Sequence, residues 1–253
     1  MLTAHQLAIG YPKKIIASNI SLQLNLGEAV AVIGPNGSGK TTLFRTLLGL
    51  LPALQGNVQL NGRSLVTLRP DEIARYVAYV PQVSASFFNF SVIEVVEMAR
   101  APHLAWYARP GAFDRKMSEQ ALDTLGILAF ANRMFHALSG GEQQLVLIAR
   151  ALAAEAPTIL LDEPTASLDF GNQFLILDAI AKLAEQGRSI LFTTHNPEHA
   201  LRVASRTLVI SRHGKVEIAA TDSILTSESL AALYGINIQV ADGPGGRIIA
   251  VAK

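Results

Sequence analysis

The sequence contains no cysteine among its 253 residues. Disulfide scaffolds, cysteine nucleophiles, zinc fingers and iron–sulfur clusters are therefore excluded. Charged residues are also few, at 16%, and the two signs nearly balance to a net charge of +1. That balance disfavours a protein that acts by wrapping nucleic acid. The first residues lack the basic-then-apolar order of a signal peptide, and the apolar stretch 47–54 is interrupted by Gly49 and Pro52. We expect a cytosolic chain unless it docks on a membrane protein.

Apolar residues are abundant instead. Half of the residues are hydrophobic, and the mean hydropathy is +0.31. Such a chain can bury a large core, and its length allows one large domain or two small ones. The hydropathy is high for a free monomer, so we expect part of the surface to meet a partner.

Five short apolar runs are continuous rather than alternating, which is typical of strands buried on both faces of a parallel sheet. They lie at 29–33, 76–80, 158–161, 189–194 and 207–210. Helical patterns occur at 40–50, 141–154 and 172–186, the last ending at Gly187, a plausible residue just beyond a helix end. The pattern predicts an α/β fold with helices packed on a sheet.

Two other regions depart from this pattern. Residues 2–9, 15–26 and 56–60 alternate weakly between apolar and polar, which favours an antiparallel β layer. Between 84 and 137 the strand signal disappears, and 92–100 and 116–125 show helical periodicity. We interpret this stretch as a helical insertion. The tail from 235 to 253 looks like a hairpin around 242–246.

A glycine-rich motif follows the first of the apolar runs and opens a helical pattern. Its residues match G-x-x-x-x-G-K-[ST] and are Gly34, Pro35, Asn36, Gly37, Ser38, Gly39, Lys40 and Thr41. Glycines let the backbone approach a polyphosphate, and the helix N-terminus presents N–H groups to it. Lys40 would place a charge near the β- and γ-phosphates, and the Thr41 hydroxyl suits Mg²⁺.

A carboxylate pair, Asp162 and Glu163, ends the apolar run 158–161. A buried strand would deliver Asp162 to the carboxyl edge of the sheet, where α/β proteins bind ligands. Asp162 could hold Mg²⁺, and Glu163 could orient or deprotonate an attacking water. The pair is a weak signal alone, but it is the expected partner of a phosphate loop.

A second glycine turn, Leu138-Ser139-Gly140-Gly141-Glu142, precedes the helix at 141–154. Ser139 and Glu142 have the spacing of a capping box, so the turn could simply be a well-capped helix start. The two glycines would also expose N–H groups to an anion. If this second anion site serves another copy's nucleotide, the active form is a head-to-tail dimer with two ATP molecules between the chains.

In combination, these motifs resemble the ATP-binding subunit of an ABC transporter from about Leu2 to about Ala220. The motifs occur in that family's order: Tyr11, the phosphate loop 34–42, Gln82, the Leu-Ser-Gly-Gly signature at 138–141, Asp162-Glu163, Ser167-Leu168-Asp169 and His195. The implied fold is an α/β phosphate-loop NTPase (RecA-like) core with an antiparallel β layer and a helical insertion subdomain. The implied extents are 1–83 with 156–220 for the layer and core, 84–155 for the helical subdomain, and 221–253 for a C-terminal helix and hairpin.

The resemblance implies a role for each motif residue. Tyr11 would stack on adenine, and Thr42 would complete the phosphate loop. Gln82 would touch Mg²⁺ or the attacking water, and His195 would hydrogen-bond the γ-phosphate and position Glu163. The second chain would contribute Ser139, Gly140, Gly141 and Glu142 to the nucleotide, and Asp169 would bridge the two copies. The other histidines, at 5, 103, 136, 199 and 213, are unassigned.

Some residues depart from the family pattern, and others narrow it. Glu142 stands where glutamine is common, and Gln143 and Leu145 stand where arginines often follow. The capping logic still holds with Glu142, so we expect activity. Residues 92–104 and 226–235 resemble importers of iron–siderophores, haem, cobalamin and molybdate. The stretch Phe192-Thr193-Thr194-His195, together with Leu145, is similar to the molybdate/tungstate members.

The resemblance therefore implies an ATP- and Mg²⁺-dependent ATPase subunit that energises a binding-protein-dependent importer of a metal chelate or oxyanion. Its expected partners are a second copy, two integral membrane permease subunits and, indirectly, a solute-binding protein, at the cytoplasmic face of the inner membrane. Phe87, Phe88 and Phe90 are candidates for the docking face or for the core. A soluble ABC ATPase acting on nucleic acid or ribosomes is the alternative, although no coiled-coil insertion, second cassette or basic arm is visible. A phosphate-loop GTPase or kinase would leave the signature turn unexplained.

Overall fold

The computed structural model describes residues 1–82, 89–105, 107–243 and 246–251. A six-stranded sheet lies at its centre, in the order β10-β9-β3-β8-β7-β6. The strands are β3 (Ala29–Ile33), β6 (Val77–Val80), β7 (Thr158–Leu161), β8 (Ser189–Thr194), β9 (Arg206–Ile210) and β10 (Val216–Ala220). The first five are parallel to one another, and β10 pairs antiparallel with β9. All five predicted apolar runs are strands of this sheet, and β3, β7 and β8 are buried along their whole length, as their unbroken hydrophobicity predicted.

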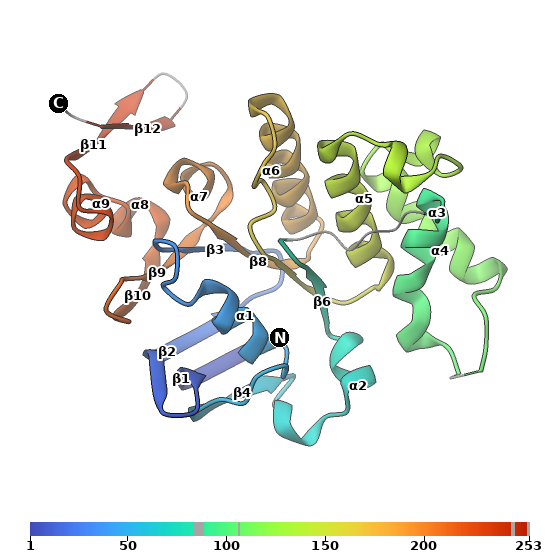
Figure 1. The fold of residues 1–253 in the computed structure, drawn as a ribbon, viewed down its shortest axis with the longest axis horizontal. Helices are drawn as coiled ribbons and strands as arrows, with labels where there is room; N and C mark the ends of the chain where they lie inside the picture. Colours follow the sequence, from blue (N-terminus) through green and yellow to red (C-terminus); the bar gives the residue numbers. More distant parts are fainter. Residues whose placement is uncertain (83–88, 106, 244–245, 252–253) are drawn as a thin grey trace.

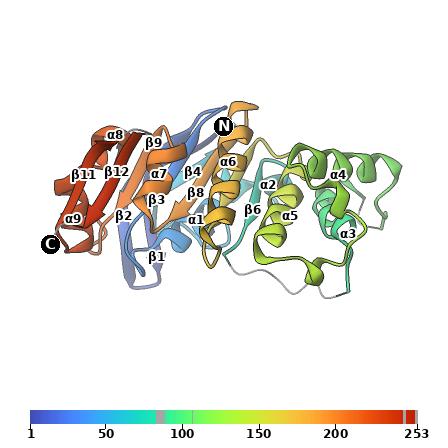
Figure 2. The same ribbon diagram turned by 90° about the horizontal axis from the view of Figure 1, so that it is seen from above.

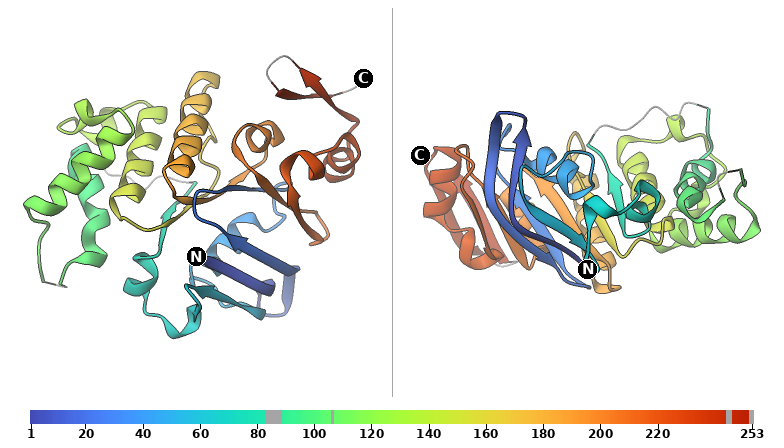
Figure 3. Two further views of the ribbon diagram at one scale, coloured as in Figure 1. Left: turned by 180° about the vertical axis from the view of Figure 1, so that it is seen from behind. Right: turned by 90° about the horizontal axis from the view of Figure 1, so that it is seen from below.

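A second, antiparallel sheet has the order β2-β1-β4-β5. Its strands are β1 (Leu2–Tyr11), β2 (Lys14–Leu24), β4 (Gln55–Leu60) and β5 (Arg63–Ser64). The predicted antiparallel layer and the α/β fold class are confirmed. This layer lies on the side of the central sheet away from α6 (Phe170–Glu185), as the rear and lower views show (Figure 3).

The two faces of the central sheet are covered by different elements. Val30 and Val32 of β3 pack with the antiparallel layer and with Leu43, Phe44 and Leu47 of helix α1 (Lys40–Leu47). Ala29, Ala31 and Ile33 face the other way and pack with α5 (Gly140–Ala153), α6 and α7 (Pro197–Val203). Because alternate residues of β3 enter two separate cores, the strand is apolar without alternation.

Helices occupy most of the chain between β6 and β7. They are α3 (Val92–Glu97), α4 (Ala112–Thr124) and α5, with short 3₁₀ turns at 98–103, 128–130 and 135–137. The helix predicted over 92–100 ends as an α-helix at Glu97, and Pro102, which lacks an N–H donor, lies in the 3₁₀ turn that follows. Helix α4 begins four residues before the predicted 116, where Asp114 accepts a hydrogen bond from the Gly111 N–H and caps it.

The remaining elements complete the two ends of the molecule. A short helix α2 (Pro70–Ala74), with a 3₁₀ turn at 65–67 before it, precedes β6. After β10 come α8 (Thr221–Ile224), α9 (Ser227–Tyr234) and the predicted hairpin of β11 (Ile238–Gly243) and β12 (Gly246–Val251). Figures 1 and 2 place α3, α4 and α5 at one end of the molecule and these C-terminal elements at the other. Within the described residues, no helix has the length and apolarity needed to cross a bilayer.

Candidate nucleotide site

The phosphate loop leaves the carboxyl end of β3 and enters α1, as its motif predicts. Gly39 has a φ of +105°, and a Cβ built there would lie 2.6 Å from Cγ2 of Ile16. A Cβ on Gly34 would lie 2.4 Å from the carbonyl oxygen of Ile210. Glycine is therefore required at both positions, one by its conformation and by the neighbouring Ile16, the other by close approach of backbone.

Lys40 is the first residue of α1, and its side chain turns back over the loop. Its ammonium donates a hydrogen bond to the Gly34 carbonyl (2.8 Å) and lies 3.4 Å from Oε1 of Glu163. Both side chains are only 8% exposed, so this ion pair is shielded from water. The ammonium is thus held over the loop, where a polyphosphate would have to compete with the Glu163 carboxylate for it.

Glu163 follows β7 and also contacts His195, which follows β8. Its Oε2 lies 2.7 Å from Nδ1 of His195. The backbone of Glu163 has a φ of +49°, which is uncommon for a residue with a side chain. Because β8 lies between β3 and β7, the loops that carry Lys40, His195 and Glu163 leave the sheet side by side. The Glu163 carboxylate thus contacts both Lys40 of the phosphate loop and His195, whose side chain is 61% exposed.

Asp162 lies one residue earlier and is 1% exposed. Its Oδ1 accepts a 2.7 Å hydrogen bond from the Thr193 hydroxyl, whose oxygen in turn accepts one from the Glu163 N–H at 2.7 Å. Its Oδ2 accepts a longer bond of 3.4 Å from the Tyr79 hydroxyl. Burial, with the charge of Asp162, raises the pKa of Tyr79 to about 12, so Tyr79 remains a donor. The weakly engaged Oδ2 keeps lone pairs that a cation could use.

A cavity of about 370 Å³ opens at the phosphate loop. The described residues that line it are Ile16, Asn36, Gly37, Gly39, Lys40, Thr41, Thr42, Gln82 and Glu163. The fold thus brings Gln82 and Glu163 to the loop, as predicted. The cavity is polar and large enough for a phosphate chain, and the unpaired N–H groups of a helix N-terminus face such a ligand. Asp162 and His195 contact this lining, through Thr193 and Glu163 respectively, without being part of it.

The other predicted nucleotide residues lie elsewhere on the protomer. Tyr11 ends β1 and is 42% exposed. Asp169 caps α6 by accepting a 2.8 Å bond from the Asn172 N–H. Of the three phenylalanines that were candidates for the docking face or the core, Phe87 and Phe88 lie outside the described residues, and Phe90 is exposed. None of the described ones among these lines the phosphate-loop cavity.

The signature turn forms the predicted capping box at the start of α5. The Ser139 N–H donates to Oε2 of Glu142 (2.7 Å), and the Glu142 N–H donates to Oγ of Ser139 (3.4 Å). Hydrogen bonds from the backbone N–H and the side chain of Ser139 to the carboxylate lower the pKa of Glu142. A Cβ on Gly141 would lie 2.4 Å from Cγ of Asn172, so this glycine lets α5 approach α6. Ser139 and Gly140 are exposed and line no part of the phosphate-loop cavity of their own chain.

Three further polar residues surround the Glu163–His195 pair, and no sequence motif predicted a role for them. Thr193 bridges Asp162 and Glu163, as described above. His199 lies on α7 and contacts Thr165, which follows β7, and Thr194, the last residue of β8. Tyr234, the last residue of α9, donates a 3.0 Å hydrogen bond to the His195 carbonyl, and burial raises its pKa to about 12. The available sequence signal for His199 was its position four residues after His195. That spacing does not distinguish a histidine of a buried polar network from an ordinary structural histidine.

Comparison with known proteins agrees with this geometry. The model of the family described as ABC transporter matches residues 17–166. The chain belongs to the ABC transporter family. It is 38% identical over 223 residues to the molybdate import ATP-binding protein MolC of Haemophilus influenzae, covering 88% of this chain and 83% of that protein.

Two solved structures place this ABC protein among transport ATPases. One is an inward-facing conformation of a putative metal-chelate type ABC transporter, with a TM-score of 0.86, 35% identity and coverage of 99% of this chain and 96% of that one. The other is the dimeric structure of a bacterial ABC transporter cassette, with a TM-score of 0.74, 29% identity and coverage of 87% and 99%. The ABC protein is therefore an ATP-binding ATPase of the phosphate-loop class. Among the residues described, no group of three or more histidine, aspartate or glutamate side chains forms a metal site by itself.

Proposed function

We propose that this ABC protein is the ATP-hydrolysing subunit of a binding-protein-dependent importer for a metal chelate or an oxyanion. The substrate class is iron–siderophore, haem, cobalamin, molybdate or tungstate. The observation that carries the proposal is the cluster of Lys40, Glu163 and His195 at the phosphate loop, in which the Lys40–Glu163 ion pair is shielded from water. The likeness to MolC and to a metal-chelate type transporter supports the import class.

The cluster suggests how hydrolysis proceeds. A bound γ-phosphate competes with Glu163 for the ammonium of Lys40, because both are anions at the same cation. The freed carboxylate then takes a proton from the attacking water, while His195, within hydrogen-bond distance of it, holds its orientation. Gln82, which lines the same cavity, orients that water.

Magnesium is the cofactor that suits this oxygen-rich donor set. The Thr41 hydroxyl, the Asp162 carboxylate and the Gln82 amide oxygen would hold it together with phosphate oxygens. When bound, Mg²⁺ neutralises charge on the phosphates. Tyr11, exposed at the end of β1, would stack on the adenine ring.

The signature turn would act on the nucleotide of a second copy. Ser139 and Gly140 are exposed at a helix N-terminus that the phosphate loop of their own chain does not use. Gly141 follows them in the first turn, and Glu142 holds that turn in shape. Two copies would sandwich two ATP·Mg²⁺, with Asp169 bridging them. The likeness to a dimeric cassette supports this arrangement.

The dimer would work on two integral membrane permease subunits, which receive solute from a binding protein, and would lie peripherally at the cytoplasmic face of the inner membrane. We assign 1–83 with 156–220 to the layer and core, 84–155 to a helical subdomain that docks on the permease, and 221–253 to a C-terminal unit. No nucleic acid partner is proposed.

The proposal is tested by expressing the full chain with its membrane partners. We expect ATPase activity that rises more than linearly with protomer concentration, recovery of the chain with an integral membrane subunit, and loss of metal or oxyanion uptake in a deletion strain. Full-rate hydrolysis by a solitary protomer would overturn the shared site. Recovery with ribosomes or nucleic acid, and unchanged uptake, would favour a soluble ABC ATPase instead.

A further inference from the structure

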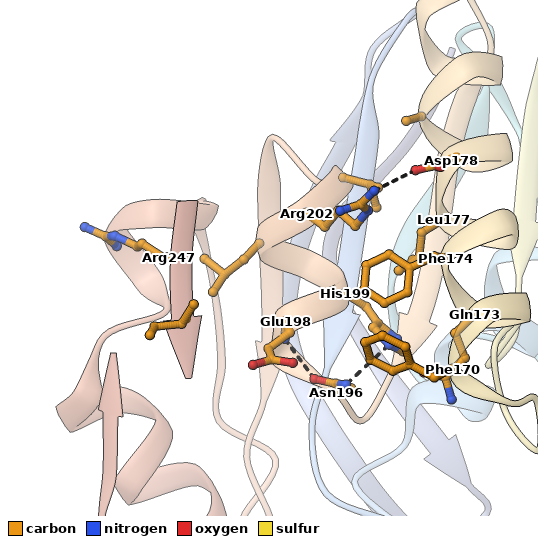
Figure 4. Close-up of a pocket in the computed structure, with 14 residues that line it drawn as sticks. Phe170, Gln173, Phe174, Leu177, Asp178, Asn196, Glu198, His199, Arg202 and Arg247 are labelled. Carbon is orange, nitrogen blue, oxygen red and sulfur yellow. Dashed lines mark hydrogen bonds and ion pairs between the residues drawn. The ribbon is translucent and has the colours of Figure 1, made fainter. Parts of the chain in front are cut away.

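His199 is a buried imidazole that the proposed hydrolysis does not use. It lies on the inner side of α7 and is 8% exposed. Beside it is a cavity of about 570 Å³, bordered by α6, α7 and the β12 strand (Figure 4). Figure 4 shows the ring next to Asn196 and, in this view, below the phenyl ring of Phe174 on α6.

The ring contacts the loop that follows β7 and the last residue of the neighbouring strand β8. Its Nδ1 lies 3.2 Å from the hydroxyl oxygen of Thr165 and 3.3 Å from that of Thr194. Thr165 is two residues beyond Glu163, after β7, and Thr194 immediately precedes His195, at the end of β8. A single side chain therefore bridges the segments that carry the two members of the Glu163–His195 pair.

The hydrogen bonds define the state of the ring. Oδ1 of Asn196 accepts the Glu198 N–H at 2.9 Å as the N-cap of α7, so the amide nitrogen of Asn196 is the group that faces Nε2 of His199, at 3.3 Å. Nε2 must then accept, and the neutral ring carries its proton on Nδ1, where a bifurcated hydrogen bond shares it between the hydroxyl oxygens of Thr165 and Thr194. Burial lowers the pKa of His199, which favours this neutral form.

A bridge is needed here because the sheet no longer holds the two segments together. The parallel pairing of β7 with β8 ends at Leu161 and Phe192, before Glu163 and His195 are reached. Next to the strands, the Thr193 hydroxyl links the Glu163 N–H to Asp162 by hydrogen bonds. On the other side of the pair, next to α7, His199 makes the corresponding link between Thr165 and Thr194. The 2.7 Å contact of Glu163 with His195 is thus bracketed by two hydrogen-bonded links.

We propose that His199 is a positioning residue, which sets the separation and orientation of Glu163 and His195 by holding Thr165 and Thr194 together. The inference rests on the proposed role of Glu163 in hydrolysis. It acts through the threonines and never touches nucleotide. Loss of the bridge lowers the rate of the chemical step, because a small misplacement of a general base is costly, but leaves the phosphate-loop contacts with ATP in place.

Three substitutions of His199 separate bridging from packing. His199→Asn keeps an N–H donor close to the position of Nδ1, His199→Gln keeps a polar group close to Nε2, and His199→Leu fills the space without hydrogen bonds. The adjoining cavity leaves room for each of them. His103→Leu is the matched control, since it removes another histidine contact, 2.9 Å from Ala154 O, in the helical region.

The assay measures kcat and KM for ATP on the full-length chain, with thermal unfolding of each variant. We expect His199→Leu and His199→Gln to lower kcat about tenfold with KM unchanged, and His199→Asn to retain activity within about threefold. His103→Leu should keep the wild-type kcat. Rescue by glutamine rather than asparagine, or a kcat that stays normal in His199→Leu, would overturn the bridge. So would a loss of rate that is equal in all three variants and follows a common fall in thermal stability.

A variant at a second position keeps the test valid if His199→Leu fails to fold. Thr165→Val is nearly isosteric and removes one hydroxyl that the ring contacts. We expect it to lower kcat, and its effect to be absent when His199 is already leucine, because both changes break one link. Additive effects would contradict the bridge. Wild-type hydrolysis and its loss in Glu163→Gln are measured in parallel, so that failure of the proposed function is recognised separately from failure of this inference.

Discussion

Replacing Glu163 by glutamine should change ATP binding and ATP turnover in opposite directions. The Glu163 carboxylate lies 3.4 Å from the Lys40 ammonium and 2.7 Å from Nδ1 of His195. Glutamine keeps the shape and a hydrogen-bonding oxygen but removes the charge. The variant therefore lacks both the proposed base and the internal anion that competes with ATP for Lys40.

The size of each effect follows from the geometry. Unit charges 3.4 Å apart attract by about 5 kcal/mol at an effective dielectric constant of 20, and the cost of desolvating a buried pair offsets most of that attraction. A net difference on the order of 1 kcal/mol would tighten ATP binding about fivefold. Loss of a general base lowers turnover by roughly 10² to 10⁴-fold. The variant should accumulate as an ATP-bound dimer.

Two measurements on the full-length chain check this prediction. Equilibrium binding of ATP without added magnesium reports the affinity, and ADP release with magnesium reports turnover. Glu28→Gln is the matched control, because Glu28 forms an ion pair with Arg206 at the amino ends of β3 and β9 and does not line the phosphate-loop cavity. Full hydrolysis by Glu163→Gln would remove Glu163 as the base, and weaker ATP binding would refute its competition for Lys40.

Three further predictions concern the surroundings of the site. Ser139→Arg should abolish turnover by blocking the partner's nucleotide while leaving ATP binding to the single chain nearly unchanged, as equilibrium binding would show. Tyr234→Phe removes one hydrogen bond to the His195 carbonyl, worth about 1 kcal/mol, and should lower kcat about fivefold at constant KM. Glu142→Ala loses the side-chain half of the capping box of α5 and should reduce the free energy of unfolding by about 1 kcal/mol, whereas Glu142→Gln should retain most of it. Because the folded pKa of Glu142 is lowered from 4.5, the advantage of wild type over alanine is complete above pH 4.5 and declines as the pH falls through that lowered value.

Each of these has a result that contradicts it. Normal turnover in Ser139→Arg would exclude the signature turn from the nucleotide of the second copy. A raised KM in Tyr234→Phe, rather than a lowered kcat, would show that the hydroxyl supports binding instead of the position of His195. A stability difference between wild type and Glu142→Ala that grows on acidification would reverse the sign worked out for the cap.

Much of the fold could be predicted because its signals are local. The runs that became β3, β7 and β8 are apolar without interruption because both of their sides are buried. The start of α5 was predictable from the sequence because its capping box is formed within four residues, from Ser139 to Glu142. The helix ends were less predictable. Helix α4 begins earlier than its periodicity indicates, since its cap uses Asp114 and the Gly111 N–H rather than an apolar pattern.

The roles of His199 and Tyr234 were not predictable for the opposite reason. Tyr234 belongs to α9, which follows the whole ATPase core in the chain, yet its hydroxyl reaches the His195 carbonyl. His199 contacts Thr165, which lies in a loop after another strand. Neither contact leaves a periodic trace in the sequence, because each depends on how distant elements pack.

By itself, the sequence determined which segments are strands and helices, where the phosphate loop lies, and which residue types could bind a nucleotide. These follow from apolar periodicity and from the backbone freedom of glycine, which are properties of near neighbours in the chain. Only the tertiary structure decided which of the candidate side chains meet. The insertion of β8 between β3 and β7 sets His195, Lys40 and Glu163 side by side, and that strand order results from pairing between strands that are far apart in the chain.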